Sequence, residues 1–330
     1  MSEKMRTLVY NFGLSVVTIL ITFWFTCGWM LTWMLWYKLL FTNYFWVSLA
    51  LLLWTVLDKA PNRGGRLYRP LRKLSIFKLW RHYFSLKVHI VSPSDITPDK
   101  NYIFGYHPHG YVGFGCLCCF ATEAVDISKK LPGMRFTQLS TRLAYIHPIF
   151  RDFLMLLGIA NASEENIRYM ANKGTGNAMV LVIGGAAETL DARPGMHRLV
   201  LKDRKGFVRT ALKTGCHLIP VYGFGENDIY DQVFNNPVGS RWRKVQRWVQ
   251  AKTGVPVLVY VYGSLKIPFW YPYRRPINIV VGKPIPVPHI SHPTEQQIDK
   301  LHQQYKKALR DLFDTHKGLY GHACSEIEFI

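Results

Sequence analysis

The N-terminal part of the chain differs from the rest in its pattern of apolar and polar positions. Between residues 7 and 57 the only charged residue is Lys38, which separates two apolar segments, about 12–37 and 39–57. A helix needs about 20 apolar residues to cross a bilayer, and both segments are near or above that length. We therefore expect residues 1–58 to form a transmembrane helical hairpin and residues 59–330 to form one further domain.

The pattern changes after residue 58 to short apolar runs that alternate with amphipathic segments. Short, uniformly apolar runs bounded by turns predict buried strands, and a period of 3.6 residues predicts helices. Strands are expected at 101–106, 178–183, 217–222, 257–262 and 277–281, and helices at 163–172, 207–214 and 294–316. Buried strands alternating with helices indicate an α/β domain with a mostly parallel sheet.

The charge of the chain then places this domain relative to the membrane. Lys and Arg number 41 against 21 Asp and Glu, a net charge of +20, and basic residues flank the hairpin on both sides, at Lys4 and Arg6 and throughout 59–81. Basic flanks favour the cytosolic side, so we expect both termini and the domain to face the cytosol. The aromatic end of the basic connector, with Trp80, could lie either in the membrane interface or in an ordinary solvated loop.

The segment His107-Pro108-His109-Gly110 is the strongest candidate for chemistry, because it directly follows the expected strand 101–106. Active sites of α/β folds lie at the carboxyl ends of strands, and an imidazole can take a proton from an alcohol near neutral pH. Gly113 continues a glycine-rich turn whose backbone N–H groups could hold an oxyanion or a phosphate. The alternative is a non-functional turn with two surface histidines.

A second candidate segment follows the expected strand 178–183. Gly184 and Gly185 permit the close approach of a ligand or of another backbone segment, and Glu188 could orient an imidazole or receive a proton. A surface carboxylate that caps a helix is the alternative.

A third candidate segment is Arg204-Lys205-Gly206, with Arg209 one turn further on. Cations at a helix N-terminus oppose the helix dipole, so their placement there suggests a bound anion, such as the phosphates of a nucleotide. A solvated basic surface is the alternative.

Other catalytic patterns are absent or weaker. The sequence has no Gly-x-Ser-x-Gly elbow, Walker loop or zinc-protease helix, and we expect no metal site. His147 and Asp152 have the spacing of glycerol-phosphate acyltransferases, which we interpret as chance. Cys116, Cys118 and Cys119 are expected to be buried thiols, and the alternatives are a metal half-site at Cys116 and Cys119 or a cysteine nucleophile.

Taken together, these segments resemble the type-2 diacylglycerol acyltransferase family, which includes monoacylglycerol and wax-alcohol acyltransferases. The resemblance covers nearly the whole chain. Its motifs are the following: 107–110, 122–124, 184–188, 204–226, 273–276 and 282–284. The chain departs from the family pattern at Ser85, where the family usually has proline, and at 262–265, where a His-Gly-Arg-Gly segment is usual.

The resemblance implies a membrane-attached relative of the lysophospholipid acyltransferase domain that makes triacylglycerol from acyl-CoA and diacylglycerol without a cofactor. It implies a location in the endoplasmic reticulum membrane and on lipid droplets. His109 or His107 would be the base, supported by Glu188. The acyl-CoA site would be formed by the following residues: Gly110, Gly113, Gly184, Gly185, Arg204, Lys205, Gly206, Arg209, Arg274 and Arg275.

Several alternatives remain open from the sequence. Monoacylglycerol or a long-chain alcohol could replace diacylglycerol as the acceptor. A non-catalytic protein of lipid droplets or of membrane shaping would explain the hairpin and its basic flank, but would leave the histidine turn unexplained. A nucleic-acid partner is not expected, since no binding module for it is present. The sequence leaves both a monomer and a homo-oligomer open.

Overall fold

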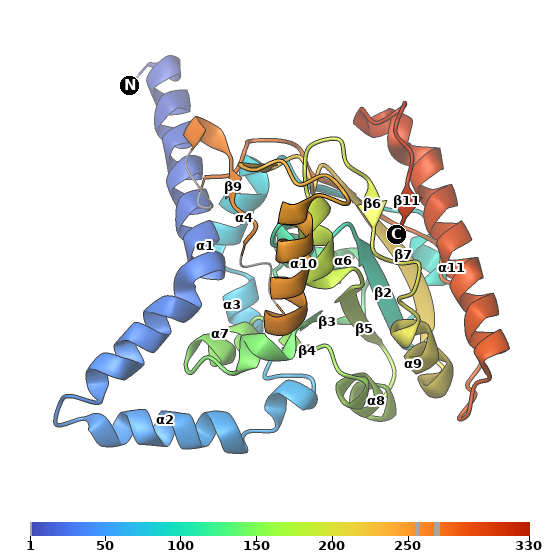
Figure 1. The fold of residues 1–330 in the computed structure, drawn as a ribbon, viewed down its shortest axis with the longest axis horizontal. Helices are drawn as coiled ribbons and strands as arrows, with labels where there is room; N and C mark the ends of the chain where they lie inside the picture. Colours follow the sequence, from blue (N-terminus) through green and yellow to red (C-terminus); the bar gives the residue numbers. More distant parts are fainter. Residues whose placement is uncertain (1, 255–257, 267–270) are drawn as a thin grey trace.

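The computed structural model describes residues 2–254, 258–266 and 271–330. Over these residues the chain forms an α/β fold with one large sheet (Figure 1). The helices are α1 (Glu3–Leu39), α2 (Phe45–Leu57), α3 (Arg69–Arg72), α4 (Ser75–Tyr83), α5 (Phe114–Phe120), α6 (Ile127–Lys130), α7 (Phe150–Leu156), α8 (Glu164–Asn172), α9 (Gly206–Thr214), α10 (Arg241–Thr253) and α11 (Glu295–His316).

The large sheet contains seven of the strands in the described residues, in the order β1-β10-β7-β2-β5-β3-β4. Their bounds are β1 (Lys87–Ile90), β2 (Tyr102–His107), β3 (Arg135–Ser140), β4 (Ile159–Asn161), β5 (Asn177–Val182), β7 (His217–Phe224) and β10 (Asn278–Val281). Strands β7, β2, β5, β3 and β4 are parallel to one another, whereas β10 runs antiparallel to β7. The expectation of a mostly parallel sheet is therefore confirmed.

Side chains of the central strands alternate between two apolar layers, as the pleat of a strand requires. Phe104 and Tyr106 of β2 belong to a layer with α5, which we call the α5 face. Ile103 of β2 and Tyr222 of β7 belong to a layer with α9 and α11, which we call the α11 face. Because both faces are covered, the central strands are apolar throughout, and this made them predictable from the sequence.

The N-terminal helices differ in detail from the expected hairpin. Helix α1 begins at Glu3 and spans 37 residues, while α2 has only 13. Lys38 lies in the last turn of α1, where a cation is favoured by the helix dipole, and the chain turns after it, at residues 40–44. Among the described helices, α1 alone is long and apolar enough to cross a membrane. At about 1.5 Å per residue α2 spans roughly 20 Å, which is less than the hydrocarbon core.

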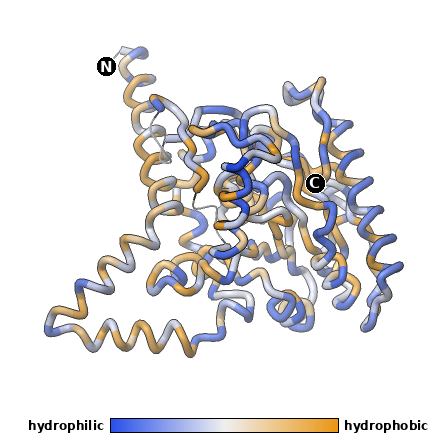
Figure 2. Tube along the Cα trace, viewed as in Figure 1, coloured by the Kyte–Doolittle hydropathy of each residue, from blue (hydrophilic) through white to orange (hydrophobic). Residues whose placement is uncertain are grey.

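The two helices form a pair that projects from the rest of the molecule (Figure 1) and is rich in apolar residues (Figure 2). At its tip the indole of Trp36 donates a hydrogen bond of 2.8 Å to the carbonyl oxygen of Ser48, and the Ser48 hydroxyl donates one of 3.0 Å to the Trp36 carbonyl. The other end of α1 packs on α4, so α1 is also a structural part of the α/β domain.

The remaining sequence predictions have mixed outcomes. Helices α8, α9 and α11 lie within one residue of their expected bounds, and α11 has the capping box between Thr294 and Gln297. The strand expected at 257–262 is confirmed only at its end. Val257 lies outside the described residues, and only β9 (Val261–Tyr262) is extended, paired with β8 (Asp231–Gln232). Trp80 lies in α4 and is fully buried against the α5 face, so the end of the basic connector is a packed helix and not a solvated loop.

Candidate active site

The two histidines at the end of β2 and just after it lie in different environments. His107 ends the strand on the α11 face, is fully buried, and its Nε2 lies 3.1 Å from the hydroxyl oxygen of Tyr305 on α11. Burial lowers the pKa of His107 to about 3, so its ring is neutral. His109 has left the strand and lines a large cavity at the carboxyl end of the sheet. Its Nδ1 lies 3.1 Å from the carbonyl oxygen of Gly110, and burial lowers its pKa.

The side chain of Glu188 binds the backbone of the turn that carries His109. Glu188 lies in a 3₁₀ turn, Gly185–Asp191, that follows the neighbouring strand β5. Its carboxylate accepts hydrogen bonds from the backbone N–H groups of His109, at 2.7 Å, and Val200, at 2.9 Å. The expected support of an imidazole ring by Glu188 is therefore not the arrangement in the structure. Burial raises the pKa of Glu188 to about 8.

Two glycines are required by this packing. A Cβ atom at Gly184 would lie only 1.9 Å from the carboxyl carbon of Glu188, and one at Gly110, where φ is +61°, would lie 2.8 Å from Cγ of Glu226. Both residues therefore allow a buried carboxyl group to approach the backbone. Of the five glycines expected to bind acyl-CoA, Gly185 lines the cavity, whereas Gly110, Gly113, Gly184 and Gly206 do not.

Glu226 is a second buried carboxyl group, to which the sequence analysis gave no role. It follows β7, the other neighbour of β2, and its Oε2 accepts hydrogen bonds from the Tyr106 hydroxyl (2.6 Å) and the Gly115 amide (2.9 Å). Burial raises the pKa of Glu226 to about 7. The turn that carries His109 is thus held from one side by Glu188 and from the other by Glu226. A carboxylate four residues past the expected strand 217–222, and two residues past the observed end of β7, was the signal available for finding it.

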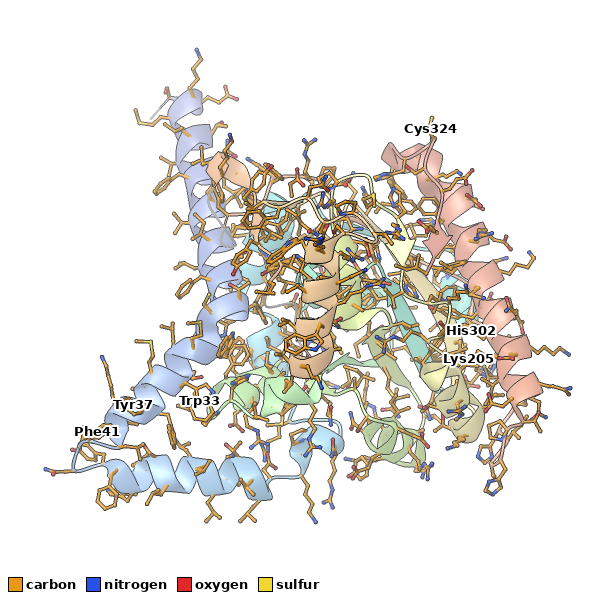
Figure 3. All side chains as sticks on the ribbon, in the orientation of Figure 1. Trp33, Tyr37, Phe41, Lys205, His302 and Cys324 are labelled. Carbon is orange, nitrogen blue, oxygen red and sulfur yellow. The ribbon has the colours of Figure 1, made fainter. Side chains whose placement is uncertain are left out.

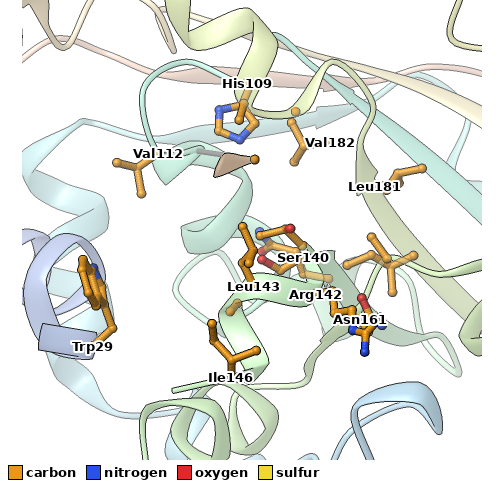
Figure 4. A pocket seen from close by; sticks show the side chains of 18 of the residues that line it. Trp29, His109, Val112, Ser140, Arg142, Leu143, Ile146, Asn161, Leu181 and Val182 are labelled. Carbon is orange, nitrogen blue, oxygen red and sulfur yellow. The ribbon is translucent and has the colours of Figure 1, made fainter. Parts of the chain in front are cut away.

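The cavity in front of His109 has a volume of about 970 Å³. In Figure 4, Trp29 of α1 lies on one side of it, Arg142 and Asn161 lie toward the opposite side, and His109 lies above. Its wall contains apolar side chains and two arginines, Arg142 and Arg204. Among the described residues that line the cavity there is no carboxylate, and nowhere in the described chain do three His, Cys, Asp or Glu residues form a group that could hold a metal.

The basic residues expected to bind acyl-CoA are divided by the structure. Arg204 lines the cavity. By contrast, Lys205 pairs with Asp299 at 2.5 Å and Arg209 with Glu295 at 2.8 Å, both on α11. Figure 3 shows Lys205 close to His302 at α11, away from Trp33 of α1. Two further arginines lie outside the cavity wall: Arg274 donates a hydrogen bond to Asn11 of α1, and Arg275 is exposed.

The structure also places the two weaker candidates, the pair His147 and Asp152 and the cysteine cluster at 116–119. His147 lines the cavity and accepts a 2.8 Å hydrogen bond from Trp33, whereas Asp152 pairs with Arg66 at 3.1 Å, so the two side chains have separate partners. The thiols of the cluster at 116–119 are fully buried on the α5 face, as expected, and none of them lines the cavity. Burial raises their pKa values, which opposes formation of a thiolate nucleophile.

A neutral histidine lies at the carboxyl end of a parallel strand and faces a cavity lined by apolar side chains and two arginines, an arrangement suited to proton transfer beside a ligand with an apolar part and an anionic part. The comparisons with known proteins define the class more closely. A family model described as diacylglycerol acyltransferase matches residues 37–329. The chain belongs to this family and is therefore an acyltransferase.

Individual relatives agree with the family model. Diacylglycerol O-acyltransferase 2 of Danio rerio is 42% identical over 86% of this chain and 79% of its own length, and that of Homo sapiens is 41% identical over 81% and 70%. Acyl-CoA wax alcohol acyltransferase 2 of Mus musculus is 41% identical over 86% of each chain. A solved structure, the 1-acyl-sn-glycerophosphate acyltransferase PlsC of Thermotoga maritima, aligns over 94% of this chain and 99% of its own, with a TM-score of 0.42 and 12% identity.

Proposed function

We propose that the chain transfers a fatty acyl group from acyl-CoA to the free hydroxyl of diacylglycerol, giving triacylglycerol and CoA. The observation that carries this proposal is the cavity below His109, which combines an imidazole, an apolar side formed with α1 and two arginines, with no carboxylate among its described lining residues. Membership of the diacylglycerol acyltransferase family supports the acceptor. No metal or prosthetic group is required by this chemistry.

The mechanism follows from the position of His109. Its ring lines the cavity and its pKa is lowered by burial, so it is a neutral base near pH 7. His109 takes the proton of the acceptor hydroxyl as that oxygen attacks the thioester carbon, and the C–S bond breaks as the tetrahedral intermediate collapses. The proton on the imidazole is returned to the departing CoA sulfur. Glu188 supports this step by holding the backbone of His109 in place.

The oxyanion of the tetrahedral intermediate needs hydrogen-bond donors, which we assign to backbone N–H groups of the turn after His109. Arg204 is the expected phosphate ligand that lines the cavity, and we assign it to CoA. Lys205 and Arg209 are less suited to this role, because each is already neutralised by a carboxylate of α11.

The membrane anchor in this proposal is the pair α1 and α2, attached to a lysophospholipid-acyltransferase-like domain. The apolar length of α1 supports insertion, and the basic residues on both flanks of the pair support cytosolic termini. We place the protein in the endoplasmic reticulum membrane and on lipid droplets. Tags at both ends should be cleaved by protease added to intact microsomes, and protection of either tag would contradict the hairpin.

A long-chain alcohol or monoacylglycerol is the second candidate acceptor. The two departures from the family pattern lie next to each other: Tyr83, which precedes Ser85 by two residues, and Ser264 both donate hydrogen bonds to the carbonyl oxygen of Pro272, at 2.7 and 3.0 Å. Ser85 and Leu265 also have positive φ angles, +44° and +58°. Because these departures lie near Tyr271, which contacts Ser15 of α1, they could alter how the acceptor enters from the membrane.

The decisive experiment gives purified full-length protein in phospholipid vesicles labelled oleoyl-CoA and four acceptors in turn: diacylglycerol, monoacylglycerol, a long-chain alcohol and lysophosphatidic acid. We expect the highest kcat/KM for diacylglycerol. Preference for the alcohol or for monoacylglycerol would replace the proposed acceptor. No acyl transfer to any of the four would favour the non-catalytic, membrane-shaping alternative.

A further inference from the structure

The cavity wall contains a second arginine, Arg142, that the sequence analysis did not single out. Arg142 begins a 3₁₀ turn, Arg142–Tyr145, directly after β3, and its side chain is exposed. In Figure 4 it lies beside Asn161, toward the side of the cavity opposite Trp29. The position therefore gives the cavity a polar, cationic end that is distinct from the end at α1.

The electrostatics of Arg142 differ from those of neighbouring arginines. Arg151, in α7, and Arg66 both pair with Asp58, at 2.5 and 2.6 Å. Arg142 and Arg204 have no ion pair within the described chain, although they line the same cavity. Arg204 lies close enough to the buried Glu188 to interact with it electrostatically, but no described lining residue carries a carboxylate, so the wall itself supplies no negative charge opposite Arg142. A cavity with this charge favours an anionic ligand.

Neutral polar groups accompany Arg142 at this end. Ser140, Thr141, Asn161 and Ser163 all line the cavity there, at the carboxyl ends of β3 and β4. Phe25 and Trp29 line the opposite end, on the helix that is apolar enough to enter a membrane. Acyl-CoA has the same division, with phosphates and polar groups at one end, an acyl chain at the other, and the thioester between them.

We propose that Arg142, together with Arg204, binds the phosphates of CoA, so that the nucleotide lies at the carboxyl ends of β3 and β4 and the acyl chain extends toward α1. This inference rests on the proposed function and adds a substrate-binding residue and a direction to it. The lipid acceptor then enters from the α1 end, and the two substrates approach His109 from opposite sides. Arg142 contributes to donor affinity, while its effect on acceptor affinity is small.

The test uses the full-length protein in vesicles and three donors: oleoyl-CoA, oleoyl-3′-dephospho-CoA and oleoyl-pantetheine, which has no phosphate. Arg142→Ala should raise the KM for oleoyl-CoA about tenfold, the loss of one exposed charge-assisted contact, and leave the KM for the acceptor unchanged. The same variant should equal wild type with oleoyl-pantetheine, and Arg142→Lys should recover part of the loss. Arg168→Ala, which removes an exposed arginine of α8 outside the cavity wall, is the matched control.

Each outcome decides the inference. An unchanged KM for oleoyl-CoA in Arg142→Ala, or an equal loss with oleoyl-pantetheine, would overturn it while the proposed function stood. If wild type transferred no acyl group, the proposed function would fail, and direct binding of free CoA would still test Arg142. In that measurement wild type should bind CoA about tenfold more tightly than Arg142→Ala, and equal affinity would overturn the inference. If Arg142→Ala did not fold, Arg142→Gln would take its place with the same expected results.

Discussion

Two sequence motifs are divided between two regions of the molecule. In each motif one residue lies at the cavity, at the carboxyl end of the sheet, and another lies against the α11 face. In the first motif His109 lines the cavity, whereas His107 is buried against Tyr305 on the α11 face. In the second motif Arg204 lines the cavity, whereas Lys205 pairs with Asp299 of α11. Residues one or two positions apart in a motif therefore lie in different environments, one at the cavity and the other in contact with α11.

The difference between the two histidines has a simple geometric reason. Side chains two residues apart in a continuing strand point to the same face, so a longer β2 would have placed both rings against α11. Proline follows His107, and β2 ends there, so the chain turns before His109. The Glu188 carboxylate then fixes the backbone of that turn.

The largest expected effect separates the two histidines. His109→Ala should lower the transfer rate by about 10²–10⁴-fold, the contribution of a positioned general base, with normal insertion into membranes. His107→Gln should instead lower stability, by about 1–3 kcal/mol, because it disturbs a buried hydrogen bond to Tyr305. The transfer rates of both variants are measured with oleoyl-CoA and diacylglycerol and are divided by the amount of folded protein.

His147→Ala is the control for this comparison, since His147 also lines the cavity but its Nδ1 already accepts a hydrogen bond from Trp33. It should keep most of the activity. A reversed result, with His109→Ala active and His107→Gln or His147→Ala inactive although folded, would show that the base has been assigned to the wrong ring.

The next effect concerns the basic motif. Arg204→Ala should raise the KM for acyl-CoA about tenfold and change kcat less, because a phosphate contact is made in both the ground state and the transition state. Lys205→Ala and Arg209→Ala should leave this KM near wild type, since their partners are on α11. Equal rises in KM for all three variants would mean that CoA displaces the α11 carboxylates, and the division between cavity and α11 face would fail for this motif.

A smaller effect is expected for the buried cysteines. Replacing Cys116, Cys118 and Cys119 together by Ala or Ser should leave substantial activity per folded molecule, because none of the thiols lines the cavity and burial raises their pKa values. Some stability should be lost with the packing. Wild-type protein incubated with labelled oleoyl-CoA and no acceptor would be examined for a hydroxylamine-sensitive label. A label that disappeared in the triple variant would establish an acyl-cysteine intermediate.

The sequence predicted those elements whose local signals agree with their burial. Strands β2, β5 and β7 are apolar on both faces, and α8 and α11 begin with side chains, Ser163 and Thr294, that cap their first turns. The histidine turn, Gly184 and Glu188 were predictable because each follows one of those strands. Their roles were less predictable. Whether Glu188 binds a ring or a backbone amide depends on how the loop after β5 meets the loop after β2.

The elements that the sequence did not predict are those whose burial involves polar groups. Strand β3 buries Thr137 and Gln138, and α10 contacts the domain through Arg243 and Gln246, which donate hydrogen bonds to backbone carbonyl groups. Neither has the apolar period that reveals a strand or helix. Arg142 was missed for a related reason, since an exposed arginine becomes informative only when the rest of the cavity wall is known to lack carboxylates.

The smallest effect compares the two carboxyl groups that hold the histidine turn, one against each neighbour of β2. Burial raises the pKa of Glu226 to about 7, above its ordinary value of 4.5, so the folded protein binds a proton that the unfolded chain releases between these pH values. The stability contributed by this proton is complete below pH 4.5 and is lost as the pH rises through 7. Between pH 6 and 8 this loss amounts to about 1.4 kcal/mol, one pKa unit of proton binding.

Glu226→Gln, which stays neutral, should remove that part of the slope of thermal stability against pH. For Glu188, with a pKa of about 8, the corresponding loss should continue to a pH about one unit higher and should vanish in Glu188→Gln. A Glu226→Gln slope identical to that of wild type from pH 6 to 8 would mean that Glu226 is already ionised in the folded protein, and that the Tyr106 and Gly115 hydrogen bonds outweigh its burial.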